Sequence, residues 1–229
     1  MQFLIIILIL CFIIFLFGLH VLAKEDLVFV RKNVTIELLF NLAFYTAGVG
    51  LLFARIVYVI LHPSSGFLNP LVFLLFPYFP GLSLIGGVVG GILFLLFYKR
   101  KKFPTGRIFD FFSMALLGAL PFGFFGAELL RGMTDIFAGI FMPILLFFTL
   151  IFFVKVLLPL NNRGELKDGS LGLLVLIIMS FTLFLTKIVH ERNDMLVLLQ
   201  IDTILLVVVF AAALTLLVLQ ERDVTHIKM

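Results

Sequence analysis

The chain has 229 residues, of which 63% are hydrophobic and 13% are charged. Soluble domains carry about 25% charged residues, so this composition excludes an ordinary soluble protein and indicates an integral membrane protein. The formal net charge of +4 gives no indication of a nucleic-acid partner, and none is expected. The single cysteine, Cys11, excludes an internal disulfide and a cysteine metal cluster. It lies within an apolar run, where a packing or lipid-facing position is expected.

Seven apolar runs approach the length of about 20 residues that a membrane-spanning helix needs. We therefore predict an all-α integral membrane protein, a bundle of about seven transmembrane helices that forms one domain over residues 1–229. The first run is expected to be a retained anchor, because nothing basic precedes it and it is too long for a signal peptide. The predicted spans are residues 3–22, 38–61, 82–98, 108–130, 136–158, 170–187 and 197–219.

The basic residues predict the orientation of these spans. If the N-terminus is outside, the inner loops and the C-terminal end hold nearly all lysines and arginines, and the outer loops hold only Arg131, Lys187 and Arg192. Cytoplasmic loops of membrane proteins carry an excess of Lys and Arg. The sequence thus predicts that the N-terminus lies outside and the C-terminus inside.

Residues 62–80 form the connection between the second and third spans on the predicted outer side. Four prolines, Pro63, Pro70, Pro77 and Pro80, prevent a long helix there. The segment is also apolar and rich in aromatic residues, which favour the membrane–water interface. We expect it to lie along the outer interface.

A glycine-rich stretch opens the third span. Gly86, Gly87, Gly90 and Gly91 recur in it at helical spacing. Small residues three and four apart allow another helix, or a lipid head group, to approach the backbone closely. Elsewhere in a helix, glycine is less favourable than alanine by roughly 0.5–1 kcal/mol. Helix packing is the simpler explanation of the stretch, and a lipid contact is the alternative.

Charged residues within spans require an explanation, because a charge in the membrane is costly. Arg55 lies in the second span, and Tyr58 follows on the same helical face. Arg55 either extends to the interface or holds the phosphate of an anionic lipid beside the Tyr58 hydroxyl. Glu128, near the outer end of the fourth span, either pairs with Arg131 or belongs to a polar site. Asp110, at the start of that span, is expected to cap its own helix.

The order of residues from the second span to the fourth is more specific evidence for a protein family than the hydropathy of the spans. The segment from Asn41 to Val59 ends in Arg-Ile-Val-Tyr-Val, and Asn-Pro-Leu follows at residues 69–71. Residues 81–90 then read Gly-Leu-Ser-Leu-Ile-Gly-Gly-Val-Val-Gly. Over about residues 41–128 this order resembles the prolipoprotein diacylglyceryl transferase family. That family has an Arg-x-x-Tyr-Val pattern followed by the signature Gly-x-Ser-x-His-Gly-Gly-x-x-Gly.

The resemblance implies an activity and its partners. The family transfers a diacylglyceryl group from phosphatidylglycerol to the lipobox cysteine of a prolipoprotein, in the bacterial cytoplasmic membrane and without a metal or other cofactor. Phospholipid, with phosphatidylglycerol first, and prolipoprotein signal peptides are the implied partners. The implied lipid-binding residues are Arg55, Tyr58, Ser83, Gly86 and Gly87, and Glu128 is the implied catalytic candidate.

The polar set that the family uses is largely replaced in this sequence. The histidine of the signature is Ile85. The family's Gly-Arg-x-Gly-Asn-Phe-x-Asn-Gly-Glu element corresponds to residues 119–128, where Leu120, Gly123 and Gly126 replace the arginine and both asparagines. Only the phenylalanine and the final glutamate remain. Aliphatic residues neither exchange protons nor bind a phosphate.

Three functions are compatible with these features. The first is an active transferase with a rearranged set of residues, for example Glu128, Arg131 and His190. The second is a catalytically silent relative that binds phospholipid or a membrane partner. The third is a transport or membrane assembly factor whose glycines only imitate the signature. The run of matches from Asn41 to Tyr58 argues against the third, and the lost polar side chains favour the second over the first.

Overall fold

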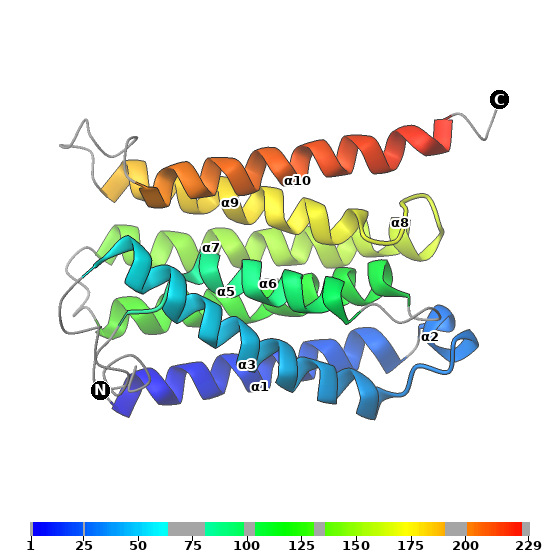
Figure 1. Ribbon diagram of the computed structural model, residues 1–229, viewed down its shortest axis with the longest axis horizontal. Helices are drawn as coiled ribbons and strands as arrows, with labels where there is room; N and C mark the ends of the chain where they lie inside the picture. Colours follow the sequence, from blue (N-terminus) through cyan, green and yellow to red (C-terminus); the bar gives the residue numbers. More distant parts are fainter. Residues whose placement is uncertain are drawn as a thin grey trace. The chain divides into compact units, whose positions relative to one another are not determined.

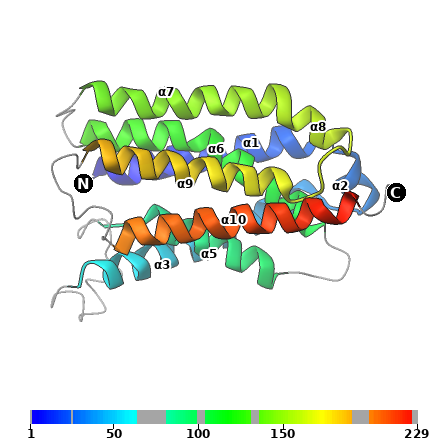
Figure 2. The same ribbon diagram turned by 90° about the horizontal axis from the view of Figure 1, so that it is seen from above.

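The computed structural model describes residues 2–24, 26–63, 81–98, 104–130, 136–190 and 201–225. Throughout these ranges the regular elements are helices, without a strand, which confirms the all-α prediction (Figure 1, Figure 2). The chain divides into two compact units. The first comprises Met1–Ile6 and Lys24–Thr105, and the second comprises Ile7–Ala23 and Gly106–Met229.

Among the described residues, five helical stretches are long and apolar enough to cross a membrane, and two further apolar helical stretches are shorter. All seven coincide with the predicted apolar runs, while the count of seven spans and their orientation stay predictions. Four long helices are α1 (Gln2–Lys24), α3 (Ile36–Leu61), α6 (Thr105–Leu130) and α10 (Ile201–Thr225). The fifth stretch joins α7 (Ile136–Phe152), η2 (Phe153–Leu157) and α8 (Leu158–Asn162). The shorter stretches are α5 (Leu84–Phe97) and the Ser170–Leu185 part of α9 (Ser170–His190).

In the first unit, α5 packs along α3 through the glycine-rich stretch. A Cβ atom on Gly90 would overlap the side chain of Phe53, and one on Gly86 would lie 2.8 Å from the Phe53 carbonyl oxygen. A Cβ on Gly50 of α3 would lie 3.2 Å from the carbonyl oxygen of Gly87. The two backbones are therefore close because side chains are missing between them. Helix packing, the simpler explanation of this stretch, is confirmed.

In the second unit, α1 packs on α6. Gly18 of α1 lies against Ala115, where an added Cβ would be 3.5 Å from the Ala115 Cα. The rings of Phe15 and Phe112 meet edge to face with centroids 5.5 Å apart. A small residue and a pair of aromatic rings thus both lie on this contact, where the two helices approach each other closely.

A π-helical turn, η2, connects α7 to α8. The N–H of Leu158 donates to the carbonyl of Phe153, five residues back instead of four. Pro159 follows at once and has no N–H to offer the carbonyl four residues before it. The proline explains why regular α-helical bonding is interrupted at this point, and the wider turn adds one residue to the helix.

The last two helices, α9 and α10, run side by side in opposite directions (Figure 1, Figure 2). The Nζ of Lys187 near the end of α9 lies 3.5 Å from a carboxylate oxygen of Asp202 at the start of α10. The sequence analysis counted Lys187 with the outer loops. In the structure it lies within α9, and its side chain is only 18% exposed.

We expect Gly90→Ala to destabilise the pair of α3 and α5, because the added methyl group would overlap Phe53. Overpacking of this kind costs roughly 1–3 kcal/mol. Gly48→Ala, also within α3, is the matched control, since its Cβ would meet nothing within 4 Å. It should be neutral or stabilising by about 0.5–1 kcal/mol. Thermal unfolding in one detergent compares the two, and equal melting temperatures would contradict the packing described.

Candidate functional site

Arg55 on α3 is buried, with 3% of its surface exposed. Its Nη1 donates to the carbonyl oxygen of Gly81 at 2.8 Å. Its guanidinium carbon lies 5.9 Å from the centroid of the Tyr58 ring. The charged group therefore does not extend to the surface of the structure. It joins α3 to the segment that leads into α5.

The entry into α5 is tightly built around Ser83. The Ser83 hydroxyl accepts the N–H of Gly86 at 3.2 Å, so Ser83 is the N-cap of α5. The backbone N–H of Ser83 donates to the carbonyl of Ala54 at 3.0 Å. Gly81 has a φ of +149°, and a Cβ there would overlap the Tyr58 ring, so only glycine fits.

The structure thus brings together the five residues that the sequence proposed for lipid binding. Arg55 and Tyr58 come from α3, Ser83 and Gly86 from the start of α5. Gly87 lies on the same contact, where a Cβ would be 3.5 Å from that of Ala54. All five are in the first unit, and a guanidinium and two hydroxyl groups provide donors suited to an anionic group.

Glu128, the catalytic candidate, lies in the last turn of α6 and is half-buried. Several positions named in the sequence analysis fall outside the described part of the chain. They are Arg131, the His190 side chain, residues 191–200, residues 64–80 of the predicted interfacial segment, and the basic residues within 99–103. The pairing of Glu128 with Arg131 stays a prediction.

The neighbouring positions of α6 are covered by α1. The Cys11 thiol points to the carbonyl of Ala119 at 3.7 Å, and a Cβ on Gly123 would lie 3.4 Å from the Cys11 Sγ. A Cβ on Gly126 would lie 2.8 Å from the Ile7 side chain, closer than real Cβ contacts. Side chains of the first helix thus occupy the space beside this part of α6.

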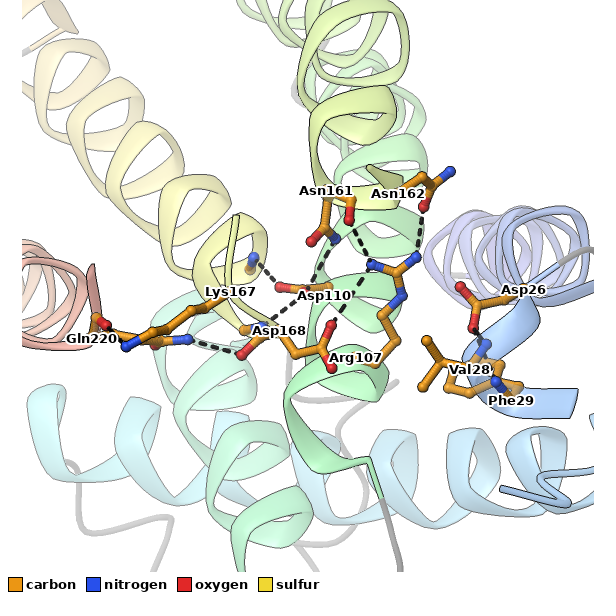
Figure 3. Close-up of polar contacts among 12 residues, drawn as sticks. Asp26, Val28, Phe29, Arg107, Asp110, Asn161, Asn162, Lys167, Asp168 and Gln220 are labelled. Carbon is orange, nitrogen blue, oxygen red and sulfur yellow. Dashed lines mark hydrogen bonds and ion pairs between the residues drawn. The ribbon is translucent and has the colours of Figure 1, made fainter. Parts of the chain in front are cut away.

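A second polar cluster lies near the other end of α6, centred on Asp110 (Figure 3). The Asp110 side chain is completely buried. Its two oxygens accept the backbone N–H groups of Gly169 at 2.8 Å and Gly172 at 2.7 Å. The Asn161 Nδ2 also donates to it, at 3.4 Å. Because α9 begins at Ser170, Asp110 caps the N-terminus of α9 from another helix.

Arg107, one turn before Asp110, holds the end of α8. Its Nη2 donates to the Asn162 side-chain oxygen at 2.6 Å, and its Nη1 donates to the Asn161 carbonyl at 3.4 Å. Asp168 lies 3.7 Å from the same Nη1. The guanidinium also lies over the Phe111 ring, 5.1 Å from the centroid.

The end of α10 joins the same cluster. The Gln220 side chain donates to the Asp168 carbonyl at 2.8 Å, and the Lys167 ammonium donates to the Gln220 carbonyl. The Ser170 hydroxyl donates to the Glu221 carboxylate at 2.5 Å. We call Arg107, Asp110, Asn161, Asn162 and Asp168, with their partners on α9 and α10, the Asp110 cluster.

The sequence assigned Asp110 to the start of its own helix, and that assignment is wrong. α6 begins at Thr105, so Asp110 lies beyond its first turn and its carboxylate is directed at α9 instead. The partners are about 50 to 60 residues away in the chain, at Asn161, Gly169 and Gly172. The polar run from Asn161 to Asp168 marked a loop in the sequence, but no spacing rule linked it to α6.

The polar side chains described above cap helices and hold backbone groups of neighbouring segments. Among them, no group of three or more His, Cys, Asp or Glu side chains could hold a metal ion. The carboxylate of Asp110 is engaged with backbone N–H groups, and Arg55 and Arg107 both donate to backbone carbonyls.

A comparison with protein-family models matches residues 4–219 to the model described as prolipoprotein diacylglyceryl transferase. The match covers nearly the whole chain, well beyond residues 41–128 that carry the sequence resemblance. No curated protein and no solved structure is significantly similar.

Replacing Asp110 by alanine should destabilise the second unit, because the N–H groups of Gly169 and Gly172 would be left without their acceptor in a buried place. Each such group costs roughly 1–3 kcal/mol. Asp168→Asn is the control, since that side chain is 49% exposed and its pair with Arg107 contributes at most about 1 kcal/mol. Thermal unfolding and proteolysis of segment 163–169 would compare them. Similar behaviour of the two variants would show that the cap is dispensable.

Proposed function

Because the chain belongs to the prolipoprotein diacylglyceryl transferase family, we propose that it is a phospholipid-binding member of that family without transferase activity. We place it in the bacterial cytoplasmic membrane, with phosphatidylglycerol as the lipid. The observation that carries this proposal is the packing of α1 against Gly123 and Gly126 of α6, described above. These positions correspond to the asparagines of the family's polar element.

The replaced side chains remove the groups that the reaction needs. The transfer requires a thiol made nucleophilic by a base and an anionic glycerol phosphate stabilised as it leaves. At the positions of the family's histidine and arginine this chain has Ile85 and Leu120. Neither hydrocarbon side chain takes up a proton or donates a hydrogen bond. Within the family's element, Glu128 provides a base and adds no positive charge.

The space that the family's polar side chains would need beside α6 is also occupied. An asparagine at position 126 begins with a Cβ, which would already lie too close to Ile7. At position 123 the Cys11 sulfur lies in van der Waals contact with the same atom. Restoring the family's residues on α6 would therefore require at least the Ile7 side chain of α1 to move as well. Loss of catalysis is supported by the packing and not only by the missing side chains.

Retention of lipid binding is supported by Arg55. A charge within a span is costly and is kept only where it serves a purpose. A guanidinium has five N–H donors in a planar fork, a geometry that suits a phosphate, and in this chain its Nη1 also holds the Gly81 carbonyl. The Tyr58 ring beside it and the Ser83 cap place two hydroxyl groups at the same end of α3 and α5.

An active transferase is the second candidate. It is favoured by Glu128, which is half-buried and stands at the position of the final glutamate of the family's element. Such an enzyme would need cationic groups other than the family's arginine. Prolipoprotein signal peptides would be its second substrate, whereas a silent relative would bind them without modification or not at all.

The two candidates differ in a rescue assay. In cells depleted of their own transferase, we expect the protein to insert into the membrane and to leave a tagged prolipoprotein unlipidated, as measured by gel shift. A functional transferase expressed at the same level is the positive control. Lipidation by the wild type that disappears in Glu128→Gln would refute the proposal and establish the active enzyme.

Lipid binding has its own test. Purified wild type should retain phosphatidylglycerol through detergent exchange, and Arg55→Ala should reduce this retention at least fivefold, as measured by mass spectrometry. Arg55→Lys keeps the charge and should retain an intermediate amount. Because Arg55 also holds Gly81, melting temperatures are compared with and without added lipid. If Arg55→Ala lowers both melting temperatures equally and keeps its lipid, Arg55 is a structural residue only.

A further inference from the structure

The short helix α2 (Leu27–Arg31) follows α1 and precedes α3. We infer that it forms, with its neighbours, a binding surface for the head groups of anionic phospholipids. This α2 surface consists of Lys24, Leu27, Val30, Arg31 and Lys32. It is separate from the site around Arg55 and does not depend on the proposed function.

The helix is fixed at both ends, although it is only one turn and a half long. The Asp26 carboxylate accepts the N–H groups of Val28 at 2.9 Å and Phe29 at 3.0 Å (Figure 3). At the other end, the Val34 N–H donates to the Phe29 carbonyl at 2.9 Å. Asn33 turns the chain there with a φ of +53°, a conformation that asparagine tolerates. The surface residues are therefore held in a defined arrangement.

One side of this helix is apolar and exposed. Leu27 is 71% exposed and Val30 is 68% exposed, whereas Phe29 on another side is 2% exposed. Leu27 and Val30 are three residues apart, and Arg31 is four residues from Leu27, so the three share one face. Two large apolar side chains beside a cation are typical of a helix that lies in the membrane interface.

The charge of the α2 surface favours anionic lipids. Lys24, Arg31 and Lys32 are all exposed, and within the described residues none of them forms an ion pair. Segment 24–32 also contains two acids, Glu25 and Asp26. The Asp26 carboxylate is 6% exposed and is directed at the helix N-terminus, so it is turned away from the surface.

The position in the chain places this surface at head-group depth. α1 ends at Lys24 and α3 begins at Ile36, and both helices are long and apolar enough to cross the membrane. A connection this short between two such helices lies at the membrane face. Near an anionic membrane surface, each Lys or Arg strengthens binding about fivefold.

The test measures which lipid surrounds α2 in the full-length protein. In a Cys11→Ser background, Val30→Cys carries an environment-sensitive fluorophore, and the protein is reconstituted in phosphatidylcholine vesicles. Brominated phosphatidylglycerol or brominated phosphatidylcholine is added as the quencher. The same fluorophore at Val208→Cys, an exposed position in α10 without a neighbouring basic residue, is the control.

We expect brominated phosphatidylglycerol to quench the label at position 30 several-fold more effectively than brominated phosphatidylcholine, and the label at position 208 equally. Arg31→Gln should reduce this preference, Lys32→Gln in addition should reduce it further, and Lys24→Gln as the third change should abolish it. Lys24→Gln, which lies outside α2, should weaken it without affecting the helix. Arg163→Gln removes an exposed charge from the end of α8 and should have no effect.

Two results would overturn the inference. If neither lipid quenches the label at position 30 while both quench it at position 208, α2 lies in water. If both lipids quench position 30 equally, or the preference is unchanged by Arg31→Gln with Lys32→Gln, the basic residues do not select the head group.

Discussion

The second unit depends on a carboxylate that accepts backbone N–H groups from a different helix. Within a membrane there is little water to satisfy the first N–H groups of a helix, so a protein group must do so. Asp110 does this for α9, and Arg107, one turn earlier on α6, does the equivalent for the carbonyl end of α8. One side of α6 therefore holds both the end of α8 and the start of α9. Ser170 and Lys167 extend these contacts to α10.

Glycine has the same physical role in both units, with different consequences. In the first unit, Gly86 and Gly90 bring the backbone of α5 against α3 while the polar groups of Arg55 and Ser83 remain nearby. In the second unit, Gly123 and Gly126 allow α1 to cover α6, at positions where the family has amides. Under the proposed function, this close packing stands where the family has polar side chains, which connects the altered sequence to the proposed loss of activity.

The sequence predicted the helical ranges well, because long apolar runs have few alternatives in a membrane protein. It also predicted glycine packing and grouped Arg55 with Ser83 through a family pattern. The sequence did not predict which residues contact each other across the fold. The role of Asp110 depends on Gly172, and that of Arg55 on Gly81, and neither pairing follows from local periodicity. The sequence did not predict the α2 surface, because a helix of five residues is too short to show a periodic pattern.

The extra residue in η2 has a consequence for how this fold can vary. Successive residues of a helix are rotated by about 100°, so one added residue turns everything after it by that angle relative to what comes before. The side of α8 that faces Arg107 is therefore rotated from the position that an unbroken α-helix would give it. Asn161 and Asn162 contact Arg107 after this wider turn, and an α8 without the extra residue would present a different side to it.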